Sequence, residues 1–280
     1  MTQATGSGGS AQPAGPAPVP GLELAGAAVV VTGAGSGIGA ALARRFSAEG
    51  ARVVVNDLDP DRARAVAAEV DGLAFPADVS DRDRVRELVD LAWDRFGRLD
   101  LFCANAGVAP PGTMDAADEM WALAWRVNVM SQVYAAQALL PRWLAAGRGR
   151  LVTTASAAGL LTLLGQAPYS VSKHATVAFA EWLRVTYGHR GVTVQALCPQ
   201  GVRTPMLSAV DDLLSPGAIS PEEVADAVVA ALAGDSFLIL PHAEVGEYYR
   251  RRADDPDRWL AGMNRLQRRR EPPVDLAAPR

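Results

Sequence analysis

The sequence predicts an α/β fold in which a doubly wound parallel sheet forms a single domain. Runs of β-branched residues alternate with segments of helical periodicity along most of the chain. This alternation is typical of a parallel sheet whose two faces are both covered by helices. A glycine-rich turn at Thr32–Gly39 follows the first β-branched run, and Asp57 ends the second. Both features are typical of the first half of an open α/β sheet.

The first predicted unit is a strand at Ala27–Thr32, a tight turn and a helix at Ile38–Glu49. Glycines at 33, 37 and 39 let the backbone approach a pyrophosphate at the helix N-terminus, where free N–H groups and the helix dipole favour anions. A lone glycine cluster often marks only a turn. Its place between a strand and a helix favours phosphate binding here.

The second predicted strand, Arg52–Asn56, ends at Asp57. A carboxylate about twenty residues beyond the glycines accepts hydrogen bonds from the adenosine ribose hydroxyls, and its charge repels a 2′-phosphate. The glycine turn contains no arginine or lysine. These observations favour NAD over NADP. The alternative is that Asp57 only ends the strand, because aspartate is common in turns.

The later elements follow the same alternation. Further strands are expected at 72–76, 99–104, 150–154, 191–197 and 236–240, with helices at 60–70, 80–96, 115–144, 169–187 and 221–233. A capping box at Ser220–Glu223 marks the start of the last of these helices. Segment Leu160–Leu164 either lines an apolar substrate pocket or covers the end of the sheet.

Three polar residues stand in the small and apolar stretch 156–173. Tyr169 and Lys173 are four residues apart on a predicted helix and therefore share one face. Lys173 is the only lysine in the chain. An ammonium near a phenol favours the phenolate, so we expect Lys173 to lower the pKa of Tyr169 and to suit it to proton exchange with an alcohol. Ser156, at the end of a predicted strand, is placed to donate a hydrogen bond to the same substrate oxygen.

A tyrosine and a lysine at this spacing more often only stabilise a surface helix. Here the serine lies thirteen residues before the tyrosine, and the chain also carries the Gly-x-x-x-Gly-x-Gly turn at 33–39. From about Leu22 to Leu240 the chain therefore resembles the short-chain dehydrogenase/reductase family, which has a Rossmann fold. We expect three regions: a disordered leader at 1–21, an NAD-binding catalytic domain at 22–240 and a partly helical C-terminal extension at 241–280.

The resemblance implies roles for particular residues. Asn128 would complete a catalytic set with Ser156, Tyr169 and Lys173 by holding a water in a proton relay; the alternative is that it only packs helices together. Cofactor contacts are implied for Gly33, Ser36, Gly37, Ile38, Gly39, Asp57, Asp78, Val79, Asn105, Ala106, Gly107, Tyr169, Lys173, Pro199, Val202 and Thr204. For Asp78 a turn role, and for 105–107 a structural role, is about as well supported. Segment 205–217 corresponds to the family's mobile substrate lid.

One departure affects the cofactor site. Relatives usually carry Pro-Gly where this chain has Pro199-Gln200. The local backbone is therefore in doubt, although Gly201 offers another position for a positive φ.

The implied activity is an NAD-dependent dehydrogenase or carbonyl reductase that interconverts a secondary alcohol and a ketone. The apolar segments of the sequence indicate an apolar substrate. The alternatives are an NADP-dependent carbonyl reductase, an epimerase or dehydratase, and a dinucleotide sensor without catalysis. The resemblance also implies a homotetramer or homodimer built on the helices that carry Asn128 and Tyr169.

Composition narrows the remaining possibilities. A net charge of −4 without a basic, aromatic-rich run gives no reason to expect a nucleic-acid partner. No metal-ligand spacing occurs, and the glycines within the apolar stretch 22–43 argue against a membrane span. Cys103 and Cys198 are expected to be buried free thiols, which indicates a cytoplasmic protein. For 241–280 we consider packing on a neighbouring subunit, a place at the pocket mouth, and a surface tail, and we favour the tail.

Overall fold

Seven parallel strands form the centre of the molecule, in the order β3-β2-β1-β4-β5-β6-β7. The structure is a computed structural model that describes residues 21–208 and 217–270. The strands are β1 (Ala28–Val31), β2 (Arg52–Asp57), β3 (Leu73–Pro76), β4 (Leu101–Ala104), β5 (Gly149–Thr154), β6 (Val192–Leu197) and β7 (Leu238–Ile239). The predictions for the leader (apart from Gly21), for 209–216 and for 271–280 lie outside the described residues.

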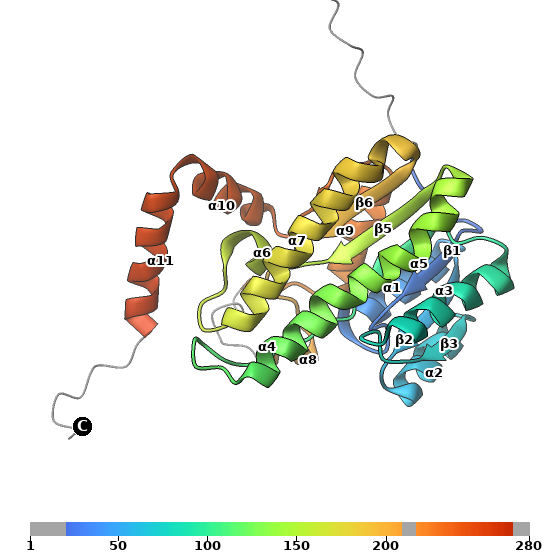
Figure 1. Cartoon of the computed structure of the whole chain (residues 1–280), viewed down its shortest axis with the longest axis horizontal. Helices are drawn as coiled ribbons and strands as arrows, with labels where there is room; N and C mark the ends of the chain where they lie inside the picture. The colour runs from blue at the N-terminus through green and yellow to red at the C-terminus, as the bar shows by residue number, and fades with distance from the viewer. Residues whose placement is uncertain (1–20, 209–216, 271–280) are drawn as a thin grey trace, which may run out of the picture.

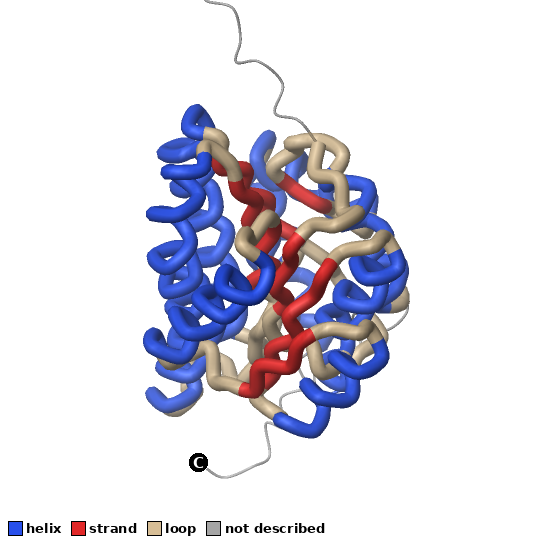
Figure 2. Tube along the Cα trace, turned by 90° about the vertical axis from the view of Figure 1, so that its right-hand side faces the viewer, coloured by secondary structure: helices blue, strands red, loops and turns tan. Residues whose placement is uncertain are grey.

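Helices cover both faces of this sheet (Figures 1 and 2). They are α1 (Gly37–Ala48), α2 (Pro60–Glu69), α3 (Arg82–Phe96), α4 (Asp118–Trp125), the π-helix η1 (Arg126–Met130), α5 (Ser131–Ala146), α6 (Ala158–Leu161), α7 (Ala167–Tyr187), the 3-10 helix η2 (Gly188–Arg190), α8 (Pro205–Ser208), α9 (Pro221–Leu232), α10 (Ala243–Asp254) and α11 (Pro256–Arg270). The predicted doubly wound α/β fold with one domain is confirmed.

The β-branched runs form strands because both of their faces are buried. In β1, Val29 and Val31 enter one apolar core and Val30 enters the other, and all three are fully buried. One core lies between the sheet and helices α1 and α9, and the other lies between the sheet and helices α3, α5 and α7. In a strand that is buried on both faces, apolar residues follow one another and do not alternate with polar ones.

Several helices differ from the sequence-based expectation, and the short helices α6 and α8 were not expected at all. The long helix expected at 115–144 begins at Asp118 and is interrupted by η1 before it continues as α5. Helix α10 was not predicted, because its sequence Ala243–Asp254 is charged and contains only one fully buried residue, Val245.

The strand order places the site. The chain runs outward from β1 to β3 and then returns to continue on the other side of β1 with β4. At such a reversal, the loops that leave neighbouring strands separate and open a crevice at the carboxyl edge of the sheet. The loops after β1, β2, β4, β5 and β6 all border the cavity described below.

Candidate active site

A cavity of about 920 Å³ lies at the carboxyl edge of the sheet. With one exception, every residue that the sequence assigned to catalysis or cofactor binding lines it: Gly33, Ser36, Gly37, Ile38, Gly39, Asp57, Asp78, Val79, Asn105, Ala106, Gly107, Ser156, Tyr169, Lys173, Pro199, Val202 and Thr204. The exception is Asn128, which is fully buried behind the cavity wall. The structure therefore brings together residues that are up to 171 positions apart in the sequence.

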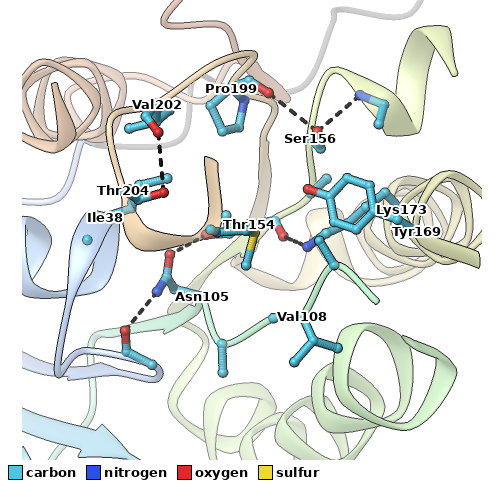
Figure 3. Close-up of a pocket in the computed structure, with 18 of the residues that line it drawn as sticks. Ile38, Asn105, Val108, Thr154, Ser156, Tyr169, Lys173, Pro199, Val202 and Thr204 are labelled. Carbon is cyan, nitrogen blue, oxygen red and sulfur yellow. Dashed lines mark hydrogen bonds between the residues drawn. The ribbon is translucent and has the colours of Figure 1, made fainter. Parts of the chain in front are cut away.

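Tyr169 and Lys173 lie on one face of α7, as their spacing predicts. The Lys173 Nζ is 5.6 Å from the centre of the Tyr169 ring and donates a hydrogen bond of 2.8 Å to the Thr154 carbonyl oxygen. Because Thr154 ends β5, this bond fixes the ammonium to the edge of the sheet. Figure 3 shows the Tyr169 phenol oxygen pointing into the same space as Ser156.

Ser156 is held just beyond the end of β5. Its Oγ accepts a hydrogen bond of 3.1 Å from the Ala158 N–H and lies 3.5 Å from the Pro199 carbonyl oxygen. These contacts fix the hydroxyl at the start of α6.

The expected lowering of the Tyr169 pKa is not what the structure gives. Burial raises the pKa of the phenol, and the hydrogen bond with Ser156 opposes the rise. The ring is partly exposed to the cavity, so water moderates this effect. Burial also lowers the pKa of Lys173 to about 8. The sequence argument counted the attraction between ammonium and phenolate, but removing two groups from water disfavours both charged forms.

Asn128 holds the cavity wall to α7. Its side-chain amide accepts a hydrogen bond from the Val108 N–H (2.8 Å) and donates to the Val108 carbonyl (2.9 Å) and to Ser172 Oγ (3.0 Å). It lies in the middle of η1, and single π-turns are frequent at functional sites. A Cβ on Gly107 would lie 3.1 Å from Asn128 Oδ1 and 3.3 Å from Lys173 Nζ, so only a glycine fits comfortably between these groups. These contacts match the helix-packing role, and the relay role stays a proposal.

The glycine turn forms a close backbone cradle at the start of α1. Gly33 and Gly37 have φ of +61° and +51°, in the region that favours glycine. A Cβ on Gly39 would lie 2.2 Å from the Gly33 carbonyl oxygen, so this position excludes every other residue. The exposed N–H groups at this helix start fit a dinucleotide's pyrophosphate.

Asp57 is fixed directly beside this turn. Its Oδ2 accepts a hydrogen bond of 2.8 Å from the Gly35 N–H, and its Oδ1 accepts one of 3.0 Å from the Asp59 N–H. The carboxylate therefore has a set orientation at the cavity edge. Arg62 approaches the same turn but forms an ion pair of 3.1 Å with Asp59.

Asp78 and Asn105 both have structural contacts in addition to their place at the cavity. Asp78 Oδ1 accepts a hydrogen bond from the Ser80 N–H at 2.8 Å, which is a turn contact. Asn105 donates to the Thr32 carbonyl (2.9 Å) and accepts from Thr154 Oγ1 (3.1 Å). Asn105 thus joins the end of β1 to the end of β5 and supports the cavity floor.

The loop after β6 is held by a histidine that the sequence analysis did not assign to the site. His242 Nδ1 accepts a hydrogen bond of 3.2 Å from the Gln200 N–H, so its Nε2 carries the proton and donates to the Gly201 carbonyl at 3.1 Å. Gly201 is not among the described glycines with positive φ, so the suggestion that it compensates for Gln200 in this way was wrong. His242, which is 4% exposed, supports this loop instead.

The C-terminal extension contributes to the cavity, so the favoured interpretation of a surface tail was wrong. Tyr248, Trp259, Met263 and Leu266 all line it. The spacing of the last three along α11 was a signal in the sequence, but nothing local showed which surface this helix faces. The leucine segment serves both of its proposed roles: Leu160 is buried in the core, whereas Leu161, Leu163 and Leu164 line the cavity.

Two kinds of feature are absent from the described residues, 21–208 and 217–270. They contain no group of three or more His, Cys, Asp or Glu side chains arranged to hold a metal ion. None of their helices is long and apolar enough to cross a membrane.

The fold and the cavity together define a nucleotide-binding α/β protein with a Ser-Tyr-Lys site. Comparison with known proteins agrees. A sequence profile of the short chain dehydrogenase family matches residues 27–213. The chain belongs to the short-chain dehydrogenase/reductase family, and it is an oxidoreductase that acts on CH–OH groups.

Three similar proteins illustrate the relationship. A 1-deoxy-11-beta-hydroxypentalenate dehydrogenase from Streptomyces avermitilis is 38% identical over 271 residues, which cover 92% of this chain and all of the relative. A meso-2,3-butanediol dehydrogenase from Serratia marcescens is 34% identical over 230 residues, which cover 78% of this chain and 91% of the relative. A crystal structure of a family member from Burkholderia phymatum in complex with NAD superposes with a TM-score of 0.77 at 29% identity, over 84% of this chain and 96% of that one.

Proposed function

We propose that this enzyme interconverts an apolar secondary alcohol and its ketone with NAD as cofactor. The observation that carries the proposal is the meeting of Ser156, Tyr169 and Lys173 in one cavity with the glycine cradle. Relatives named for a hydroxypentalenate and for butanediol support a hydroxyl-bearing substrate.

A nicotinamide dinucleotide fits the residues of the cavity. Gly33, Gly37 and Gly39 would accommodate the pyrophosphate, and Asp57 would bind the adenosine ribose hydroxyls. Asp57 supports NAD over NADP because its charge opposes a 2′-phosphate. Arg62, a nearby cation, already pairs with Asp59. When bound, the dinucleotide supplies hydride transfer at its nicotinamide C4 carbon.

The protein's own residues would exchange the proton. Tyr169 takes a proton from the alcohol during oxidation and returns it to the oxygen during reduction. Ser156 donates a hydrogen bond to that oxygen and fixes its position beside the phenol. Lys173 holds a positive charge one helical turn from the phenol and would also bind the nicotinamide ribose. Asn128 keeps the wall at 107–108 in place and would hold the relay water.

The apolar substrate is supported by the part of the cavity beyond Ser156 and Tyr169. Leu161 ends α6, Leu163 and Leu164 follow it, and Met206 and Leu207 belong to α8. Such surroundings bind hydrocarbon, and the polar pair sets the orientation of the reacting carbon.

A screen of secondary alcohols with NAD and with NADP, read by absorbance of the reduced cofactor, tests the proposal. We expect turnover with NAD and a higher kcat/KM for NAD than for NADP. A preference for NADP would contradict the role of Asp57. Products formed without net oxidation would indicate an epimerase or dehydratase, and NADH binding without turnover of any alcohol would indicate a sensor.

We also propose that two copies of the chain associate through α7 and α4. Val171, Trp182 and Val185 follow one another along one stripe of α7, and Trp182 and Val185 are 56% and 77% exposed. Trp125 on the neighbouring α4 is also half-exposed. Large apolar side chains grouped in this way are typical of protein interfaces.

A further inference from the structure

The C-terminal helix α11 presents one apolar face to the cavity. Trp259, Met263 and Leu266 line the cavity and are spaced by four and three residues, which places them on the same side of a helix. Leu260, the residue after Trp259, points away and is 62% exposed. The helix therefore contributes a wall to the cavity. Figure 1 shows α11 set off from the sheet and joined to it through α10.

Helix α10 fixes this wall to the catalytic part of the molecule. Arg252 donates a hydrogen bond to the Leu160 carbonyl oxygen, and its Nη1 lies 3.3 Å from His174 Nε2. His174 Nδ1 lies 2.9 Å from the Ser170 carbonyl oxygen, so Nδ1 carries the proton and Nε2 accepts from Arg252. Leu160 follows Ser156 by one helical turn, and His174 is next to Lys173. The anchor is thus attached to the two segments that carry the catalytic groups.

An aromatic contact joins the two helices of the extension. The rings of Tyr248 on α10 and Trp259 on α11 are 6.2 Å apart and tilted by 41°. Because Tyr248 also lines the cavity, the wall continues from one helix to the other. At the base of α10, fully buried Val245 holds the helix against the core.

The part of the cavity beyond Ser156 and Tyr169 is lined by several apolar segments. These segments are the α10–α11 wall, the leucines at and after the end of α6, and the apolar residues of α8. Ser156 and Tyr169 form the polar end. A substrate with one hydroxyl on a large hydrocarbon body would cover these walls, whereas a short diol would leave them facing water and place a second hydroxyl among apolar side chains.

We propose that Trp259 and Met263, held in place through Arg252, select bulky alicyclic secondary alcohols and ketones over short-chain diols. This inference rests on the proposed function. It assigns substrate selection to the C-terminal extension, outside the part of the chain that the family profile matches.

Kinetics with 2-decalol and 2,3-butanediol test the selection. Wild type should have the higher kcat/KM for 2-decalol. Trp259→Ala and Met263→Ala should each lower kcat/KM for 2-decalol by about tenfold or more, mainly through KM, because each removes several apolar atoms from the wall. Both should leave butanediol turnover unchanged. Leu260→Ala, on an exposed face of the same helix that does not line the cavity, is the matched control and should change neither. Equal losses on both alcohols, or no loss, would overturn the proposal.

Direct binding separates this inference from the proposed function. Calorimetry with 2-decalone in the presence of NADH should give a Kd that rises about tenfold in Trp259→Ala and stays constant in Leu260→Ala. Arg252→Met should weaken 2-decalone binding and leave NADH binding intact, whereas Arg251→Met, whose side chain forms an exposed ion pair with Glu247, should weaken neither. Binding that follows this pattern without turnover would refute the proposed reaction alone. If Trp259→Ala binds 2-decalone as wild type does and turnover is normal, substrate selection by the α11 residues is refuted and the proposed reaction is not.

Discussion

At the scale of single residues, burial sets the chemistry of the site. Lys173 is 3% exposed, and its ammonium donates a hydrogen bond to the neutral Thr154 carbonyl. A buried ammonium with a neutral partner is disfavoured, which is why its pKa falls to about 8. The folded protein thus loses stability in order to keep a cation beside Tyr169.

Replacing Lys173 should show this loss. The folded pKa of about 8 lies below the ordinary 10.5, so the unfolded chain binds more protons between these values and stability rises with pH across this window. Below pH 8 the penalty is fully present and amounts to roughly 3 kcal/mol. Lys173→Met removes the penalty but leaves the Thr154 carbonyl without its donor, which costs about 1–3 kcal/mol.

We therefore expect Lys173→Met to abolish turnover and to raise the Tm at pH 7, without added cofactor, by roughly 2–4 °C. The gain should shrink as the pH approaches 10, because wild-type Lys173 then becomes neutral. Thermal unfolding of both proteins at pH 7 and pH 9.5 measures this difference directly. A variant that unfolds below wild type at pH 7 would contradict the account.

Residue-scale predictions from sequence succeeded where the geometry is local. Tyr169 and Lys173 share a face because an α-helix fixes residues four apart, whatever surrounds them. The pKa direction of Tyr169 was not predictable, because it depends on how much water the folded chain excludes. His242 was missed for a related reason: its partner Gln200 lies 42 positions away, and no local pattern joins them.

At the scale of elements, the loop after β6 depends on the extension. His242 is the N-cap residue of α10 and bonds the backbone of both Gln200 and Gly201. Pro199 and Val202 flank these two residues in the chain, and both line the cavity. We infer that His242 positions this loop for the nicotinamide end of the cofactor.

His242→Ala should weaken NADH binding by about tenfold or more, because two backbone groups of the loop lose their hydrogen-bond partner. His242→Asn, whose side-chain oxygen can still accept from Gln200, should recover part of the affinity. His189→Ala, an exposed histidine after α7, is the control. Fluorescence titration with NADH gives the Kd values. A lower Tm with unchanged NADH affinity would mean that His242 only stabilises the fold.

Element-scale predictions were good where periodicity was strong. The capping box at Ser220 formed as expected, with both reciprocal hydrogen bonds present. The π-turn around Asn128 was not predictable, because an extra residue in a helix leaves the apolar pattern on both sides almost unchanged. Helix α10 was missed because its sequence is charged and the contacts that hold it, such as that of Arg252 with Leu160, join segments far apart in the chain.

At the scale of the whole molecule, alternation of strands and helices was enough to predict the sheet, since only a parallel sheet with both faces covered buries seven such runs. The alternation does not predict how copies of the chain associate, because the exposed apolar stripe on α7 packs against nothing within one chain.

The stripe on α7 should place a second copy there. We expect wild type to sediment as a dimer or tetramer, and Trp182→Asp with Val185→Asp to sediment as a smaller species, because charges in an apolar interface lose hydration without gaining partners. Leu260→Asp, equally exposed but on α11, should leave the assembly unchanged. A monomeric wild type, or an unaltered double variant, would contradict the proposed interface.

The central claim is that the Tyr169 phenol exchanges the proton while the cavity independently holds the cofactor. Tyr169→Phe removes one oxygen and keeps the ring, so its turnover of a secondary alcohol should fall by about 10²–10⁴-fold while NADH still binds. Tyr187→Phe, at the far end of the same helix, should retain both. The decisive measurement is the kcat of Tyr169→Phe beside its Kd for NADH. Lost turnover with retained binding is the predicted result, and near-normal turnover would contradict the mechanism.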